Sequence, residues 1–168
     1  MNILINLNKI KNNFLKKENL FFLVFALIVF SLDRITKSKI LNIYNENTYF
    51  INDYVNIDLI WNIGIGFGFL STESTLFYNL ISMLIGIVIL LLAYFLTISE
   101  KIDKFIYAII IGGALGNFYD RLAYKAVPDF IDIHYNNFHW FTFNVADIFI
   151  TVGILIFVIR SFFVNDEK

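Results

Sequence analysis

The chain contains 168 residues, of which 58% are hydrophobic and only 16% are charged, and its formal net charge is −1. Soluble domains carry about 25% charged residues, so this composition is typical of a membrane protein. The chain has no cysteine, which excludes a disulfide framework, a thiolate metal site and a cysteine nucleophile. Basic residues are not in excess, and we therefore expect no nucleic-acid partner.

Four apolar stretches follow one another along the chain. A helix that crosses the hydrocarbon core of a bilayer needs about 20 apolar residues. Residues 76–98 satisfy this alone, and residues 20–32, 105–119 and 145–159 do so together with their flanks. The sequence therefore predicts an all-α membrane protein with a single integral domain over residues 1–168. Its four transmembrane helices are expected at about 20–40, 76–98, 104–122 and 143–164.

Two other interpretations of these stretches are less consistent with the sequence. The helices of a soluble bundle should keep a polar stripe, whereas residues 76–96 have almost none. The first stretch follows several lysines, as a secretory signal peptide would. It is followed by Asp33-Arg34 instead of small residues, which favours an uncleaved first helix.

The distribution of Lys and Arg predicts the orientation. The N-terminal segment, the loop after residue 98 and the C-terminal tail together carry eight basic and five acidic residues, whereas the other side carries five basic and nine acidic residues. Basic loops stay in the cytoplasm, so both termini are expected there. Segments 41–75 and 123–142 then lie outside. Alternation over residues 49–61 suggests short strands, and aromatic residues 138–141 suit a membrane interface.

Three of the predicted helices bring polar side chains to one depth. With a rise of 1.5 Å per residue, Asp33, Asp120 and Asp147 each lie roughly 20–24 Å from the inner end of their helix. Ionisable residues at membrane depth are costly and usually mark a functional site. The residues that share this outer layer are Asp33, Lys37, Asn117, Asp120, Arg121, Asn144 and Asp147.

The acids in this layer are not equivalent. Asp147 begins a helix, where a carboxylate favours the helix dipole, whereas Asp33 and Asp120 lie towards helix C-termini and need cationic partners. Lys37 follows Asp33 by four residues on one helical face, and Arg121 adjoins Asp120.

Asp129 lies in an extended segment after Pro128. Two close carboxylates can share one proton and hydrolyse a peptide bond, but Asp129 with Asp147 is one of several possible pairs.

Other chemistries have weaker support. The two histidines, His134 and His139, form no H-E-x-x-H motif, so a zinc site would need acids recruited without a pattern. The glycine-rich segment 64–68 opens no nucleotide-binding unit and is interpreted as a tight turn or a packing contact. Gly112, Gly113 and Gly116 give the third helix a small face for close packing.

Five sequence blocks in this order are similar to those of bacterial lipoprotein signal peptidase (signal peptidase II). The similarity extends over the whole region from the first to the fourth predicted helix. Any one block would be weak, but five in register are specific. The blocks are residues 33–37 (DRITK), 62–68 (NIGIGFG), 112–121 (GGALGNFYDR), 127–131 (VPDFI) and 143–147 (FNVAD).

This resemblance implies an aspartic endopeptidase of the bacterial cytoplasmic membrane with Asp129 and Asp147 as catalytic residues. Such an enzyme cuts diacylglyceryl-modified prolipoproteins before the lipidated cysteine, binds inhibitors of the globomycin type, and needs neither cofactor nor metal. We expect it to act as a monomer among membrane lipids. The family fold adds a small extracytoplasmic β-cradle and an interfacial helix within residues 41–75. The implied substrate-binding set is Asp33, Lys37, Asn62, Gly112, Asn117, Asp120, Arg121, Asn144 and Ala146.

The chain departs from the family pattern at three positions. Arg34 replaces a usual Gln, Lys125 replaces a usual Gly four residues before Asp129, and Phe141 stands where Pro is common. None of these changes removes a catalytic group. Two other functions remain as alternatives: a non-enzymatic proton, ion or lipid-binding protein, which should have a polar path across the bilayer, and a presenilin-like protease, which should carry its acids at mid-membrane. The polar layer at one surface disfavours both.

Overall fold

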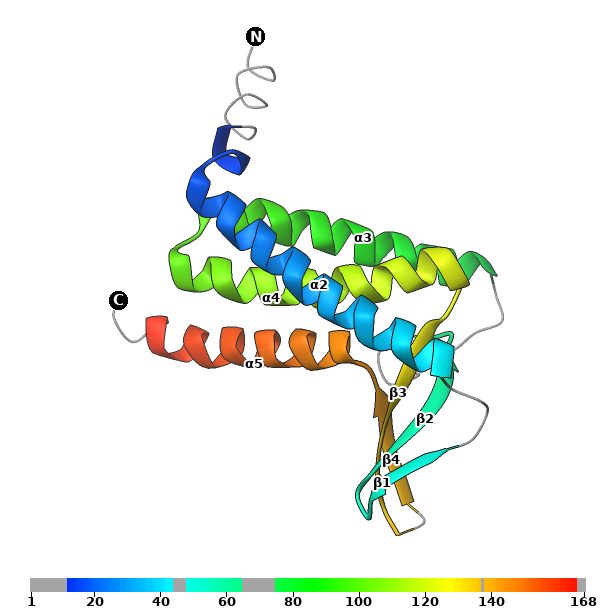
Figure 1. Cartoon of the computed structure of the whole chain (residues 1–168). Helices are drawn as coiled ribbons and strands as arrows, with labels where there is room; N and C mark the ends of the chain where they lie inside the picture. Colours follow the sequence, from blue (N-terminus) through cyan, green and yellow to red (C-terminus); the bar gives the residue numbers. More distant parts are fainter. Residues whose placement is uncertain (1–11, 44–47, 65–74, 137, 166–168) are drawn as a thin grey trace.

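The structure, a computed structural model, describes residues 12–43, 48–64, 75–136 and 138–165 (Figure 1). Four long helices lie side by side, and a small sheet extends from one end of them. The start of α2 and the end of α5 lie at the opposite end. The elements in chain order are α2 (Lys17–Ile43), β1 (Tyr49–Asn52), β2 (Val55–Asn62), α3 (Thr75–Ile98), α4 (Lys101–Tyr124), β3 (Val127–Tyr135), β4 (Phe138–Phe143) and α5 (Val145–Asn165).

Three helices in the described part of the chain are long and apolar enough to cross a membrane. They comprise Lys17–Ile43, Tyr78–Ile98 and Val145–Phe163. Large apolar side chains on these helices remain exposed, as with Leu90 at 71% and Phe163 at 71%. Apolar surface of this extent suits a lipid environment better than water. The structure therefore supports a membrane protein with at least these three spans.

Helix α4 differs from the other three because it packs extensively against each of them. It begins with three charged residues and carries Asp120 and Arg121 near its end, so its apolar segment is shorter than that of its neighbours. Most of its middle is buried, including Ile106, Ala108 and Ile111. Since the other helices cover α4, its composition is set by contact with protein more than by contact with lipid.

Glycines on α4 explain how closely the helices approach. A Cβ on Gly112 would lie 2.5 Å from the Cβ of Val29 on α2, and one on Gly113 would lie 2.6 Å from the carbonyl oxygen of Ala146 on α5. A Cβ on Gly116 would collide with the carboxylate of Asp33. Small residues let helix backbones approach in this way, and here they bring α2 and α5 against the same stretch of α4.

The sheet is antiparallel, with strand order β1-β2-β3-β4. Strands β1 and β2 occupy the region where sequence alternation suggests strands. The hairpin of β3 and β4 is larger than expected, because the sequence indicated only an extended segment near Asp129 and interfacial aromatic residues. Alternation is weak in β3, whose first four residues are all buried. The interfacial helix expected within 41–75 and most of the glycine-rich segment 64–68 lie outside the described residues.

Helix α4 ends at Tyr124 and is followed by the C-cap residue Lys125, which has a left-handed backbone with φ 59° and ψ 17°. The side chain of Lys125 is exposed, so this departure from the usual glycine places no charged group in the protein interior. The left-handed conformation costs a residue with a Cβ about 1–2 kcal/mol, which explains why glycine suits this position.

Replacing Lys125 with glycine should stabilise the protein. Relief of the left-handed strain exceeds the extra chain entropy that glycine loses on folding, so the expected gain is about 0.5–1 kcal/mol. Thermal unfolding in detergent measures it. Lys125→Ala is the matched control, because alanine removes the charge and keeps the Cβ. Equal stabilisation by alanine would show that the charge, and not the backbone, is responsible.

Candidate active site

A buried lysine joins α2 to α4 near the end of the helices that carries the sheet. Lys37 Nζ lies 2.9 Å from Asp33 Oδ2 and 2.7 Å from Asp120 Oδ2. The same ammonium donates a hydrogen bond of 2.8 Å to Asn117 Oδ1. The side chains of Lys37, Asp33 and Asp120 are fully buried. Three acceptors therefore satisfy the three N–H donors of the lysine.

Arg34 completes this charged group. Its Nη1 forms a 2.7 Å ion pair with Asp120 Oδ1, and its Nη2 lies 3.2 Å from Asp33 Oδ2. The guanidinium also lies over the ring of Tyr119, 4.8 Å from its centroid. Two acids thus face two cations, which leaves the cluster without net charge. In the sequence Arg34 is evident only as a departure from the family pattern, because its partner Asp120 lies on another helix.

Arg121 does not form the ion pair with Asp120 that their adjacency in the sequence suggested. The cationic partners of Asp120 are Lys37 and Arg34. Arg121 instead donates from Nη2 to the carbonyl oxygen of Gly64, at 2.8 Å, and from Nη1 to that of Asn117. It is buried, and it links α4 to the chain that follows β2. The adjacency of Asp120 and Arg121 was therefore a wrong guide to their pairing, since consecutive helical residues point in different directions.

A capping box holds Asp147 at the start of α5. The side-chain oxygen of Asn144 accepts the Asp147 backbone N–H at 3.1 Å, and Asp147 Oδ2 accepts the Asn144 backbone N–H at 3.1 Å. This reciprocal arrangement satisfies two donors at the helix N-terminus. Asn117 Nδ2 donates to the other carboxylate oxygen of Asp147 at 2.8 Å. Because Asn117 also accepts from Lys37, the buried charge cluster positions this carboxylate.

Asp129 lies on β3, next to the end of β2. It is buried, and it accepts hydrogen bonds from Asn62 Nδ2 at 2.9 Å and from Asn144 Nδ2 at 2.6 Å. The pKa of Asp129 is raised to about 6, first by burial and then by the negative charge of Asp147, while the two hydrogen bonds oppose the rise. The Asp129 carboxyl therefore keeps its proton to a higher pH than a free aspartate does.

Asn144 brings the two carboxylates together. Its side-chain amide binds Asp129, and its backbone N–H binds Asp147. One residue thus contacts an acid from the sheet and an acid from a helix. Two carboxylates within reach of one asparagine, one of them buried, can activate a water molecule between them.

Two small residues implied by the family resemblance, Gly112 and Ala146, lie at contacts between helices and offer no polar side chain. Gly112 lies against Ala26 and Val29 of α2. Ala146 is buried, and its backbone N–H donates to Asp33 Oδ1 at 3.0 Å. The remaining residues of the implied set take part in the hydrogen-bond network around the two acids; they are Asp33, Lys37, Asn62, Asn117, Asp120, Arg121 and Asn144.

A largely apolar pocket of about 290 Å³ lies beside Asp147. Asp147 is partly exposed, so its carboxylate can meet a molecule that enters the pocket. The pocket lies where β4 leads into α5, and its lining residues are Phe141, Phe143, Asp147, Ile148, Thr151 and Val152.

The model of the family described as signal peptidase (SPase) II matches residues 25–163. The chain belongs to the signal peptidase II family. A lipoprotein signal peptidase from Pelagibacter ubique (strain HTCC1062) is 46% identical over 149 residues, which cover 87% of this chain and 90% of the relative. One from Francisella tularensis subsp. novicida (strain U112) is 37% identical over 92% of this chain and 99% of the relative.

Solved structures agree with this family assignment. A bacterial membrane enzyme determined by the in meso method at 2.3 Å resolution matches with a TM-score of 0.72 and 27% identity, over 88% of this chain and 91% of that one. A second such structure at 1.9 Å resolution matches with a TM-score of 0.67 and 28% identity, over 83% and 91%. As a signal peptidase II, the chain is a membrane-bound protease.

Replacing Lys37 with methionine should destabilise the protein severely. The change leaves the buried carboxylates of Asp33 and Asp120 without their main counter-charge, and loss of one partner from a buried ion pair costs about 3–5 kcal/mol. Thermal unfolding in detergent measures the loss. Lys39→Met is the control, because Lys39 is exposed on the same helix. A Lys37→Met protein as stable as this control would contradict the structural role of the cluster.

Proposed function

We propose that the chain is an aspartic endopeptidase that removes the signal peptide from diacylglyceryl-modified prolipoproteins and cuts before the lipidated cysteine. The observation that carries this proposal is the convergence of Asp129 and Asp147 on Asn144. The names of the relatives support lipoprotein precursors as the substrates. No step of the proposed reaction uses a metal or a cofactor.

The two acids take different roles in this mechanism. Asp147 is ionised and takes a proton from the attacking water, since it lies in the first turn of α5, where the helix dipole favours negative charge. Asp129 carries the shared proton and donates it as a hydrogen bond to the scissile carbonyl oxygen. When the peptide bond breaks, Asp129 transfers this proton to the leaving amine, and the proton that Asp147 took from water then returns to Asp129. Its deeper burial and its pKa of about 6 support this assignment.

The developing oxyanion needs a further N–H donor. The side-chain amide of Asn144 is already engaged with Asp129. Nε of Arg121 is buried and has no hydrogen-bond partner among the residues that the structure describes. Of the two candidates, Arg121 is therefore the better oxyanion donor, and Asn144 is better suited to positioning the acids.

All four helices cross the bacterial inner membrane in this proposal, with both termini in the cytoplasm. In addition to the three apolar spans, α4 also crosses the membrane, because residues 105–119 lack charges and the other helices cover them. The excess of basic residues on one side supports this orientation. The start of α2 and the end of α5 lie far from the sheet (Figure 1), so the acid pair belongs to the outer face.

The pocket beside Asp147 suits a lipidated substrate. Its walls are mainly aromatic and aliphatic, and they belong to β4 and the outer part of α5. A substrate can thus enter laterally while both acyl chains of its cysteine remain in the bilayer, and a cyclic depsipeptide of the globomycin type would compete there. Both acids come from one chain, so a monomer is sufficient for catalysis.

Asp129→Asn and Asp147→Asn should each abolish cleavage of a diacylglyceryl-modified prolipoprotein. Each change removes a group that must exchange a proton, so we expect a loss of at least about 10²-fold in kcat. The measurement uses purified protein and a gel-shift assay for the released signal peptide. Asp53→Asn is the control, because Asp53 is an exposed acid in the β1–β2 turn. Normal processing by either dyad variant would overturn the aspartic mechanism.

The same assay tests the substrate. The lipidated precursor should be cut, the unlipidated precursor should not, and globomycin should block the reaction. Equal cleavage of both precursors would retain the peptidase assignment and would contradict recognition of the lipid.

Asn62→Ala should shift the pH dependence of kcat/KM. The free enzyme keeps its shared proton below the pKa of Asp129, about 6, and loses this general acid as the pH rises through that value. The hydrogen bond from Asn62 favours the ionised carboxylate and so lowers this pKa. Its removal raises the pKa further and moves the falling alkaline limb to higher pH. Asn79→Ala, at an exposed position on α3, should leave the limb unchanged. A limb that stays in place or moves to lower pH in Asn62→Ala would contradict the role of Asp129.

A further inference from the structure

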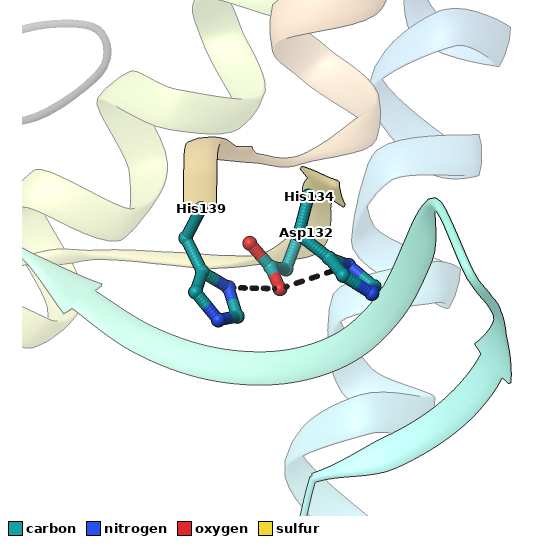
Figure 2. Close-up of side chains that lie close together, drawn as sticks. All are labelled: Asp132, His134 and His139. Carbon is teal, nitrogen blue, oxygen red and sulfur yellow. Dashed lines mark hydrogen bonds and ion pairs between the residues drawn. The ribbon is translucent and has the colours of Figure 1, made fainter. Parts of the chain in front are cut away.

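A second cluster of ionisable side chains lies on the β3–β4 hairpin, outside the acid pair. Figure 2 shows Asp132 between His134 and His139, with both rings directed towards its carboxylate. His139 Nδ1 lies 2.8 Å from Asp132 Oδ2, and His134 Nδ1 lies 3.6 Å from the same oxygen. One potential ligand atom from each residue falls within 4.8 Å of the others. The mechanism proposed above uses none of these three side chains.

Strand geometry explains why these residues meet. Asp132 and His134 are two positions apart on β3, so their side chains lie on the same face of the sheet. His139 on β4 is the cross-strand partner of His134, and directly opposed side chains lie close together. On the other side, Asn56 of β2 pairs with Asp132. The register of three strands thus gathers two imidazoles, a carboxylate and an amide.

The polar atoms of this cluster are poorly satisfied by the protein. Asp132 is 2% exposed and His134 is 8% exposed. Within the described ranges, Asp132 Oδ1, His134 Nδ1 and Asn56 Oδ1 are buried and have no hydrogen-bond partner. Native proteins rarely leave such atoms unpaired unless water, an ion or a ligand completes them. Three unpaired atoms on neighbouring strands therefore point to a missing ligand.

We propose that Asp132, His134 and His139 bind one divalent transition-metal ion of the Zn²⁺ type. Two imidazole nitrogens and one carboxylate oxygen are a typical three-residue ligand set for Zn²⁺, with a fourth position for water. Ca²⁺ and Mg²⁺ prefer oxygen ligands and are excluded by the two imidazoles. A metal would also replace the long 3.6 Å contact of His134 with a direct bond.

The proposed ion has a structural role. It joins β3 to β4, and this hairpin carries Asp129 near its start and leads directly into the Asn144 cap of α5. Only His139 is substantially exposed, at 60% of its side chain, so a metal can enter from that side. The sequence contains no recognisable metal motif for this site, because the acid and one histidine come from β3 and the second histidine comes from β4.

Metal binding is tested on the full-length protein, purified in detergent without a histidine tag and stripped with a chelator. Isothermal titration with Zn²⁺ should give one saturable site per chain. His139→Ala should weaken this binding at least about tenfold, since even changes around metal ligands cost that much. Asp53→Asn, which removes an exposed acid from the same sheet, should bind Zn²⁺ as the unaltered protein does. Excess Mg²⁺ should not compete.

Two further readouts separate a metal site from a simple ion pair between Asp132 and His139. Zn²⁺ should raise the midpoint of thermal unfolding in the unaltered protein and not in Asp132→Asn. Co²⁺ bound to the unaltered protein should give visible absorption bands, and these bands should be absent from His139→Ala and Asp132→Asn. No saturable binding, equal affinity in His139→Ala, or competition by Mg²⁺ would overturn the proposal. A loss of stability in the variants that is independent of Zn²⁺ would assign the cluster to ion pairing alone.

Discussion

The rest of the site depends on one buried ammonium group. Lys37 is held by Asp33, Asn117 and Asp120 at the contact between α2 and α4. Burial of a single charge in apolar surroundings is strongly unfavourable, so each member of this cluster is stable only while the others are in place. Close helix packing through Gly112 and Gly116 makes the contact possible. The cluster thereby couples the packing of the membrane helices to the position of polar groups.

The two acids are linked to this cluster by short hydrogen-bonded paths. Lys37 orients Asn117, which binds Asp147, and Asp33 binds the backbone of Ala146 in the first turn of α5. Asn144 is linked to Asp147 through the capping box, and its side-chain amide binds Asp129. Rigid support of this kind suits the mechanism proposed above, because the relative position of two carboxylates determines whether they can share one proton.

A nearly apolar environment also explains the chemistry. Burial raises the pKa of Asp129, and the neighbouring charge of Asp147 adds to the effect. The same conditions that make charges costly in a membrane protein therefore favour the protonated acid that the proposed peptide hydrolysis needs. The pocket beside Asp147 has largely apolar walls, which suit the proposed substrate with its acyl chains.

The sequence by itself determined the apolar helices, the outer polar layer and the pairing of Asp33 with Lys37, because hydropathy and helical spacing depend only on residues near one another in the chain. Five motif blocks predicted the identity of the acid pair through family resemblance. Tertiary structure alone decided that Arg34 and not Arg121 accompanies Asp120, that Asn144 contacts both acids, and that Asp132 lies between two histidines. Those contacts join helices and strands far apart in sequence, and their partners are chosen by packing and strand register, which no local pattern records.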